Sequence, residues 1–348
     1  MGCLFSKKNN IDNIEFIEQI TTKQLNEEQK EELNNIENYK KNLQYENLVL
    51  EGGGIKGIAY CGAFQVLEDL NILQNIKRVA GSSAGAILGT LIAIGYTSAE
   101  IKDIMVNFDF EALIDDKIGI IRDGINLIKD YGYTEGDYFL NEMGKLIEKK
   151  TNDSNYTFKQ LFDQHGRTLV LVGCDLKKQN AVYFSHLYSP DLSIKQAVRI
   201  SMSYPFVFEP VRYRDTLFID GGFADIYPLH VFDGEYPGDP NAIKNLLTPN
   251  PKTLGLKLLT DNITINKNTN ELNIDTKIDN IIDFTTSIID SFFSMSERKH
   301  MTDKYWARTI SIKIPNISSL DFSISDEIKQ NLVVCGEISV KKFLKIEI

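Results

Sequence analysis

The chain has 348 residues, of which 43% are hydrophobic and 25% charged, and its 38 basic and 48 acidic side chains give a formal net charge of −10. This length allows one large domain or two smaller ones, and the composition is ordinary for a globular protein, which excludes a disordered, collagenous or coiled-coil chain. The acidic balance argues against a nucleic-acid partner, because no basic stripe is available to replace phosphate counterions. No apolar run reaches the roughly 18 residues that a membrane-spanning helix needs.

The first residues carry an acylation pattern. Gly2 follows the initiator methionine and Ser6 stands four positions later, as N-myristoylation requires, and Cys3 is placed for palmitoylation. Two acyl chains give lasting attachment, whereas one chain gives only marginal binding. We therefore expect residues 1–10 to be an N-terminal lipid-anchor segment, and the protein to be cytoplasmic and peripheral on a phospholipid membrane.

Cysteine usage agrees with that compartment. Four cysteines occur without CxxC spacing: Cys3, Cys61, Cys174 and Cys335. This pattern predicts neither a disulfide framework nor a zinc site, and it indicates a reducing environment.

Residues 11–46 are rich in Asn, Gln, Glu and Lys, which predicts a polar, acidic stalk between the anchor and the body. Residues 47–348 then form one domain in which short apolar runs alternate with helical spacing. Strands are expected at 48–50, 76–80, 168–174, 216–219 and 253–259, helices at 58–70, 84–94 and 279–299, and a polar loop at 261–277. Because strand and helix alternate, we predict an α/β fold, a three-layer α/β/α sandwich with a mainly parallel central sheet.

Residues 81–85 form a G-x-S-x-G pattern between a predicted strand and an apolar helix. At such an elbow the central residue adopts a strained backbone, and the glycines on either side let the chain pass closely. Gly81 and Gly85 flank Ser83 at the required spacing, whereas Ser82 has alanines there, so Ser83 is the candidate nucleophile. The free amides and the dipole of the helix face the position where an oxyanion would develop.

A second glycine cluster follows the first predicted strand: Gly52, Gly53, Gly54, Lys56 and Gly57, with Ile55 between them. It satisfies G-x-G-x-x-G, but the next strand ends without the carboxylate that a dinucleotide-binding fold uses to hold the ribose. A P-loop is excluded too, since no Gly-Lys-Ser/Thr follows. Consecutive glycines can instead form a nest of backbone amides that binds an oxyanion, with the lysine adding positive charge. These residues are therefore the candidate oxyanion hole, an arrangement that suits acyl transfer.

Asp220 is the candidate base. It follows a predicted strand and precedes Gly221 and Gly222, so the rule for open α/β sheets directs it to the crevice at the carboxyl ends of the strands. Partial desolvation beside an acyl tunnel would raise its pKa and strengthen its hydrogen bond to a serine. Taken alone, an Asp-Gly-Gly run is more typical of a simple turn, so the residues by themselves favour that alternative. None of the four histidines stands in an obvious catalytic context: His165, His186, His230 and His300.

Taken in order, residues 52–57, 81–85 and 220–222 resemble the patatin-like phospholipase family, and residues 197–210 and 306–344 are also similar to it. The resemblance runs from the first strand to the C-terminus. It implies a serine–aspartate dyad without histidine, an oxyanion hole from the first glycine loop, and hydrolysis of lipid acyl esters without calcium, other metals or a cofactor.

Carried over to this chain, the resemblance makes Ser83 the nucleophile, Asp220 the base and the amides of Gly53 and Gly54 the oxyanion donors. Residues 47–348 are then a patatin-like acyl-hydrolase domain of phospholipase A or lysophospholipase type, and a protein activator is conceivable but not identified. One departure is that similar proteins often carry Asn-x-Pro after Asp-Gly-Gly, whereas this chain has Ile-Tyr-Pro at 226–228. An Asn that would brace the loop is therefore absent.

Two alternatives remain open at this point. An α/β-hydrolase esterase would use a Ser83–Asp220–His230 triad, which has the required chain order, although only ten residues separate the last two. A catalytically inactive, membrane-tethered patatin-like scaffold would bind lipid without cleaving it. The apolar, charge-dotted stretch at 108–133 is a candidate interfacial lid or acyl-channel wall, or else an ordinary packed pair of helices.

Overall fold

The computed structural model describes residues 44–113, 134–234, 248–260 and 301–346, together with the single positions 31, 42 and 287. The predicted anchor with Gly2 and Cys3, most of the stalk, the loop at 261–277 and nearly all of the helix at 279–299 lie outside the described residues. So does the larger part of the candidate lid.

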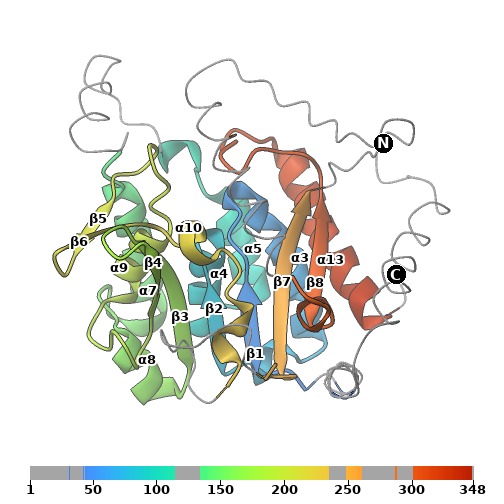
Figure 1. Ribbon diagram of the computed structural model, residues 1–348. Coiled ribbons are helices and arrows are strands. Elements are labelled where there is room, and N and C mark those ends of the chain that lie inside the picture. Colours follow the sequence, from blue (N-terminus) through green and yellow to red (C-terminus); the bar gives the residue numbers. More distant parts are fainter. Residues whose placement is uncertain are drawn as a thin grey trace, which may run out of the picture.

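An eight-stranded sheet in the order β5-β6-β3-β2-β1-β7-β8 organises the described chain, with β4 paired to β3 (Figure 1). The strands are β1 (Asn47–Leu50), β2 (Arg78–Gly81), β3 (Thr168–Asp175), β4 (Asn180–Phe184), β5 (Val211–Tyr213), β6 (Thr216–Asp220), β7 (Thr253–Thr260) and β8 (Thr309–Ile314). Pairing is parallel throughout β3-β2-β1-β7-β8, whereas β4, β5 and β6 are attached by antiparallel pairs. The predicted α/β sandwich with a mainly parallel sheet is confirmed.

Helices cover the sheet. They are α3 (Ala59–Asp69), α4 (Ala84–Ala93), α5 (Ser98–Asn107), α7 (Asp137–Thr151), α8 (Phe158–His165), α9 (Ile194–Ser201), α10 (Gly222–Asp225), α12 (Asp303–Trp306) and α13 (Asp326–Leu344). Short 3-10 helices are η1 (Gly54–Ile58), η2 (Leu73–Asn75), η3 (Glu111–Leu113) and η4 (Leu229–Phe232). Figure 1 shows α10 in front of the sheet and α4 behind it.

Side chains that alternate along the strands build two cores. Leu48 and Leu50 of β1 belong to the larger one, under α3, α4 and α13, and Val49 belongs to the smaller one, under α10 and η4. Such alternation with burial on both faces is what a strand covered by two helical layers requires. Tyr45 is also buried in the larger core, two residues before the predicted domain boundary.

Local sequence explains several element boundaries. Thr97 and Glu100 form a capping box at the start of α5, and Thr157 and Gln160 form another at the start of α8, each satisfying amides that the first helical turn leaves unpaired. The predicted strand at 76–80 begins two residues later, at Arg78, because η2 precedes it. The strands β4, β5 and β8 were not predicted. In the part of the chain that the structure describes, no helix combines the length and apolar character needed to span a bilayer.

Candidate active site

Ser83 lies in the turn between β2 and α4, with φ 52° and ψ −122°. A positive φ is unfavourable for a residue with a side chain, so the surrounding structure must hold this strained conformation. The two flanking glycines are sterically required: a Cβ at Gly81 would collide with the carbonyl of Gly85, and a Cβ at Gly85 would collide with the carbonyl of Leu50. The backbone has the geometry of a nucleophile elbow.

Asp220 is almost completely buried, with 1% of its surface exposed, and its Oδ1 accepts a hydrogen bond of 2.7 Å from the Gly222 N–H. Burial raises the pKa of its carboxyl to about 7, and hydrogen bonding from the Ser83 hydroxyl and the Gly222 N–H opposes that rise. Oδ2 makes no regular hydrogen bond to any residue that the structure describes. A lone pair on this oxygen is therefore available to accept a proton.

The direction of β6 differs from the sequence prediction. The rule that placed Asp220 in the crevice holds for parallel strands, but β6 runs antiparallel to β3. Asp220 nevertheless reaches the carboxyl edge because β3 extends past β2: Gly81 ends β2 opposite Leu171, and Gly173, two residues further along β3, pairs with Asp220. The position was predicted, but for the wrong reason.

The end of α9 connects the two catalytic candidates. The Ser83 N–H donates to the Ser201 hydroxyl oxygen over 3.0 Å, and the Gly221 N–H donates to the Ser201 carbonyl over 3.2 Å. In addition, the Asp220 N–H donates to the Ser203 carbonyl over 2.9 Å. Ser201 therefore holds the serine turn and the Asp-Gly-Gly loop to one helix end. Sequence reasoning did not single it out, although it lies in the stretch 197–210 that resembles the family.

The first glycine loop leads from β1 into η1. Its Gly53 and Gly54 N–H groups find no acceptor among the described residues, whereas the Gly52 N–H donates to the Ile226 carbonyl over 3.0 Å. Gly52 therefore is not a free donor. Gly52 has a different, steric role. A Cβ at this position would lie 3.1 Å from Cβ of Ser83, so the missing side chain leaves the serine accessible. Two of the predicted donors, Gly53 and Gly54, remain available to an oxyanion.

Packing holds this loop against the nucleophile turn. A Cβ at Gly57 would lie only 3.2 Å from Cβ of Ala84, the first residue of α4, so η1 and α4 pack tightly. Gly54 has φ +56°, and a Cβ there would collide with the Ser319 carbonyl. Lys56 is half-buried in the same 3-10 helix. The glycine loop and the elbow, predicted to meet at adjacent parallel strands, lie side by side.

A buried ion pair anchors the base of the loop. Glu51, the residue before Gly52, pairs with Lys257 of β7, and its other carboxylate oxygen accepts the Leu258 N–H over 2.7 Å. Both charged side chains are about 2% exposed. The pair and this hydrogen bond hold the start of the glycine loop against β7, and removing one partner would leave an uncompensated buried charge.

His230 contacts Asp225 and Tyr183, and not the catalytic candidates. Its Nδ1 lies 3.6 Å from the Asp225 carboxylate and its Nε2 lies 3.3 Å from the Tyr183 hydroxyl, which itself donates to Asp225 over 2.8 Å. The groups that set the pKa of Asp220 do not include this histidine. The structure therefore does not assemble the alternative triad. The Asp225–Tyr183 hydrogen bond ties α10 to β4, which braces the loop where the family's Asn is absent.

Comparison with known proteins decides the family. The sequence pattern described as patatin-like phospholipase matches residues 48–233, more than half of the chain. The chain belongs to the patatin-like phospholipase family. Its relatives include the uncharacterized protein R571 of Acanthamoeba polyphaga mimivirus, which is 33% identical over 86% of this chain and 93% of the relative. The probable lipid hydrolase 463L of Invertebrate iridescent virus 6 is 29% identical over 54% of this chain and 63% of its own length.

Solved structures agree on the fold. The crystal structure of VipD from Legionella pneumophila superposes with a TM-score of 0.55 at 17% identity, covering 87% of this chain and 67% of VipD. Family membership and the lipid-hydrolase relative support hydrolysis of lipid esters as the class of activity.

Proposed function

We propose that this protein hydrolyses fatty-acyl esters of phospholipids or lysophospholipids, with Ser83 as nucleophile and Asp220 as general base. The observation that carries the proposal is the combination of a strained serine, a buried carboxylate of raised pKa and two glycine amides without an acceptor. A base is most effective when its pKa lies near the working pH, and burial brings the pKa of Asp220 to about 7, close to neutral pH.

In the acylation step the Asp220 carboxylate accepts the proton of the Ser83 hydroxyl while Oγ attacks the ester carbonyl carbon. The carbonyl oxygen becomes an oxyanion, which the Gly53 and Gly54 N–H groups stabilise together with the N-terminal end of α4. When the intermediate collapses, the bond to the alcohol oxygen breaks and Asp220 returns the proton to that oxygen. The lysolipid or glycerol-phosphate alcohol leaves, and the acyl group stays on Ser83.

Deacylation repeats the sequence with water. Asp220 accepts a proton from a water molecule whose oxygen attacks the acyl carbon, and the same amides hold the second oxyanion. Collapse breaks the bond to Oγ, which recovers its proton from Asp220, and a free fatty acid is released. One carboxylate therefore serves as base and acid alternately, and no histidine is needed.

Two measurements test this function. Fatty-acid release from mixed phospholipid vesicles should be lost in Ser83→Ala, and a fluorophosphonate probe should label the wild-type chain on Ser83. The matched control is Ser82→Ala, because the neighbouring hydroxyl is buried without a partner in the described chain and has no place in the reaction. Full activity of Ser83→Ala would refute the assignment, and a wild-type chain that neither labels nor releases fatty acid would favour the inactive lipid-binding scaffold.

We also propose that acylation at Gly2 and Cys3 attaches the protein to the cytoplasmic side of a membrane, where its substrate lies. The support is the acylation pattern of the sequence alone. Intact-mass measurement of the protein made in eukaryotic cells should show both acyl groups, Cys3→Ser should lose one of them, and Gly2→Ala should shift the protein from the membrane to the soluble fraction. An unmodified mass would contradict the proposal.

A further inference from the structure

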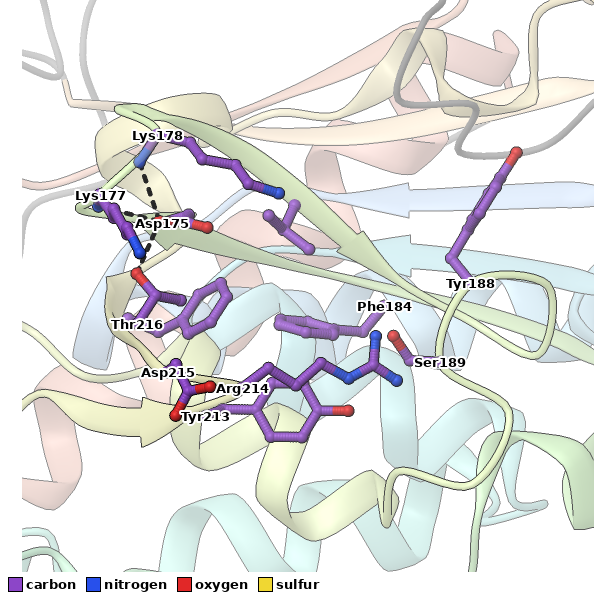
Figure 2. Close-up of a pocket in the computed structure, with 12 residues that line it drawn as sticks. Asp175, Lys177, Lys178, Phe184, Tyr188, Ser189, Tyr213, Arg214, Asp215 and Thr216 are labelled. Carbon is purple, nitrogen blue, oxygen red and sulfur yellow. Dashed lines mark hydrogen bonds between the residues drawn. The ribbon is translucent and has the colours of Figure 1, made fainter.

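A cavity of about 460 Å³ lies between the turn of the β3–β4 hairpin and the turn of the β5–β6 hairpin (Figure 2). Its volume is within the range of roughly 300–1,000 Å³ that is usual for small-molecule sites. None of its lining residues belongs to the serine elbow, the glycine loop or the Asp-Gly-Gly run. The cavity is therefore separate from the proposed reaction centre.

The floor of this hairpin cavity is apolar. Phe184, Tyr213 and Phe218 form a cluster whose ring centroids lie 5.5 to 6.2 Å apart, and Val182 extends it along β4. Phe184 and Phe218 are only 1% and 4% exposed, so the hydrocarbon surface that faces the cavity comes from the partly buried Tyr213 and Val182, which the two phenyl rings support from below. A hydrocarbon chain that covered this apolar surface would remove it from water, which is favourable.

The rim of the cavity carries cations that form no ion pair within 4.0 Å in the described structure, although the charge of Lys178 helps to lower the pKa of the Asp175 carboxyl. Lys178 comes from the β3–β4 turn and Arg214 from the β5–β6 turn, and Figure 2 shows their side chains extending along the cavity from opposite hairpins. Among the described residues neither side chain forms an ion pair, and both residues are exposed. Lys177 adds a third cation to the lining.

Two carboxylates also line the cavity, Asp175 and Asp215, so the cations are in excess by one. Asp175 is 2% exposed, and its Oδ1 accepts hydrogen bonds from the Lys177 and Lys178 N–H groups and from the Thr216 hydroxyl. This carboxylate therefore shapes the β3–β4 turn and ties it to β6. The Lys178 and Arg214 side chains are exposed, so an anion that enters from solvent can reach both.

The β5–β6 turn holds its arginine in an unfavourable backbone conformation. Tyr213 pairs with Thr216, so Arg214 and Asp215 are the two central residues of the hairpin turn, and their φ angles are 48° and 58°. Turns with positive φ at both positions strongly favour Asn-Gly. Arg214 therefore occupies a position at which arginine is unfavourable. Its guanidinium carbon lies 5.1 Å from the centre of the Tyr213 ring, which lines the cavity.

We propose that the hairpin cavity is an accessory binding site for a single-chain anionic amphiphile, whose head lies between Lys178 and Arg214 and whose chain covers the aromatic floor. The shared chemistry is a carboxylate or a phosphate monoester on one hydrocarbon chain. The site does not depend on ester cleavage. Its floor includes Phe218, two residues before Asp220 on β6, so an occupant would contact the strand that carries the proposed base.

The test is calorimetric titration of the full chain with four soluble probes below their micelle concentrations. Decanoate and monodecyl phosphate carry both a chain and an anion, decyl maltoside carries a chain without charge, and inorganic phosphate carries charge without a chain. None is a carboxylic ester, so Ser83 cannot consume it. We expect the two anionic amphiphiles to bind at least roughly tenfold more tightly than the other two, and their order of affinity distinguishes the two head groups.

Three variants locate the binding. Arg214→Gly removes the cation while relieving the positive φ, and Val182→Phe fills the cavity while leaving every charge in place. Arg212→Ala is the matched control, because Arg212 is exposed on the same hairpin but does not line the cavity. We expect the dissociation constant for decanoate to rise roughly tenfold or more in the first two variants and to stay unchanged in the third.

Equal binding by all three variants would overturn the proposal, as would equal affinity of decyl maltoside or inorganic phosphate for the wild type. Circular dichroism of each variant distinguishes lost binding from lost folding. Failure of this proposal would leave fatty-acid release and probe labelling at Ser83 unaffected, so the two proposals are judged separately.

Discussion

Replacement of Asp220 by Asn separates the role of the carboxylate in catalysis from its effect on folding. The amide has the same size, and its oxygen can still accept the Gly222 N–H, but it cannot accept the Ser83 proton. We therefore expect the rate of fatty-acid release to fall by roughly 10²–10⁴-fold, the usual contribution of a positioned base. We also expect the variant to be more stable than the wild type at neutral pH.

The size of that stabilisation follows from the pKa of Asp220, which is about 7 in the folded protein against an ordinary value of 3.8. Between these values the folded chain keeps a proton that the unfolded chain releases, so the free energy of unfolding falls as pH rises from about 4 to 7 and is level above that. With ~1.4 kcal/mol for each pKa unit, a rise of about three units corresponds to on the order of 4 kcal/mol at pH 8. The Asp220→Asn variant has no such charge to bury.

Urea unfolding at pH values from 4 to 8.5 measures the difference. The Asp220→Asn variant and the wild type should be nearly equal at the acid end and diverge up to neutral pH. Ser83→Ala is the control, because it also removes a catalytic group but keeps the carboxylate, which loses a hydrogen bond that lowers its pKa. Its stability should therefore fall with pH at least as steeply as that of the wild type. A difference between wild type and Asp220→Asn that is constant from pH 5 to pH 8 would refute the reasoning.

Three further substitutions test other parts of the structure. Ser201→Ala removes the acceptor of the Ser83 N–H, so kcat should fall roughly tenfold with KM unchanged, and Ser201→Thr should restore it; a change in KM alone would count against a positioning role. Asp233→Asn leaves the fully buried Arg308 without its counter-charge and with one acceptor fewer than the two that now lie at 2.5 and 2.6 Å, and should lower the free energy of unfolding in urea by about 3–5 kcal/mol. His230→Gln should lower stability but keep kcat for fatty-acid release, whereas loss of kcat in a folded variant would revive the triad.

Much of the site could be predicted because its glycines stand at positions where any side chain would collide with the backbone. Gly81 and Gly85 are required where backbone atoms pass within collision distance of a side chain, and that need is visible in the residue type alone. The same holds for Gly54, whose positive φ disfavours any side chain. Short apolar runs likewise predicted β1 and β3, since strands buried on both faces need no polar positions.

Other parts of the site could not be predicted because they depend on pairing between distant segments. The three residues of β5 are too few for a periodic pattern, and β4 has partly exposed residues that make it resemble a loop in sequence. Because these strands were not predicted, neither the antiparallel direction of β6 nor the hairpin cavity could be inferred from the sequence. Ser201 was missed for a similar reason, since its hydroxyl meets a backbone amide 118 residues away in the chain.

The sequence by itself determined where this chain turns sharply, which hydroxyl stands at the tightest turn and which segments are buried, because these properties belong to single residues and their near neighbours. Only the tertiary structure decided that β3 extends past β2 to receive Asp220, and that His230 joins Asp225 and not Ser83. It also decided that the Asp220 carboxyl is buried deeply enough for its pKa to reach about 7. Register, burial and charge environment arise from contacts between segments that the order of residues does not place together.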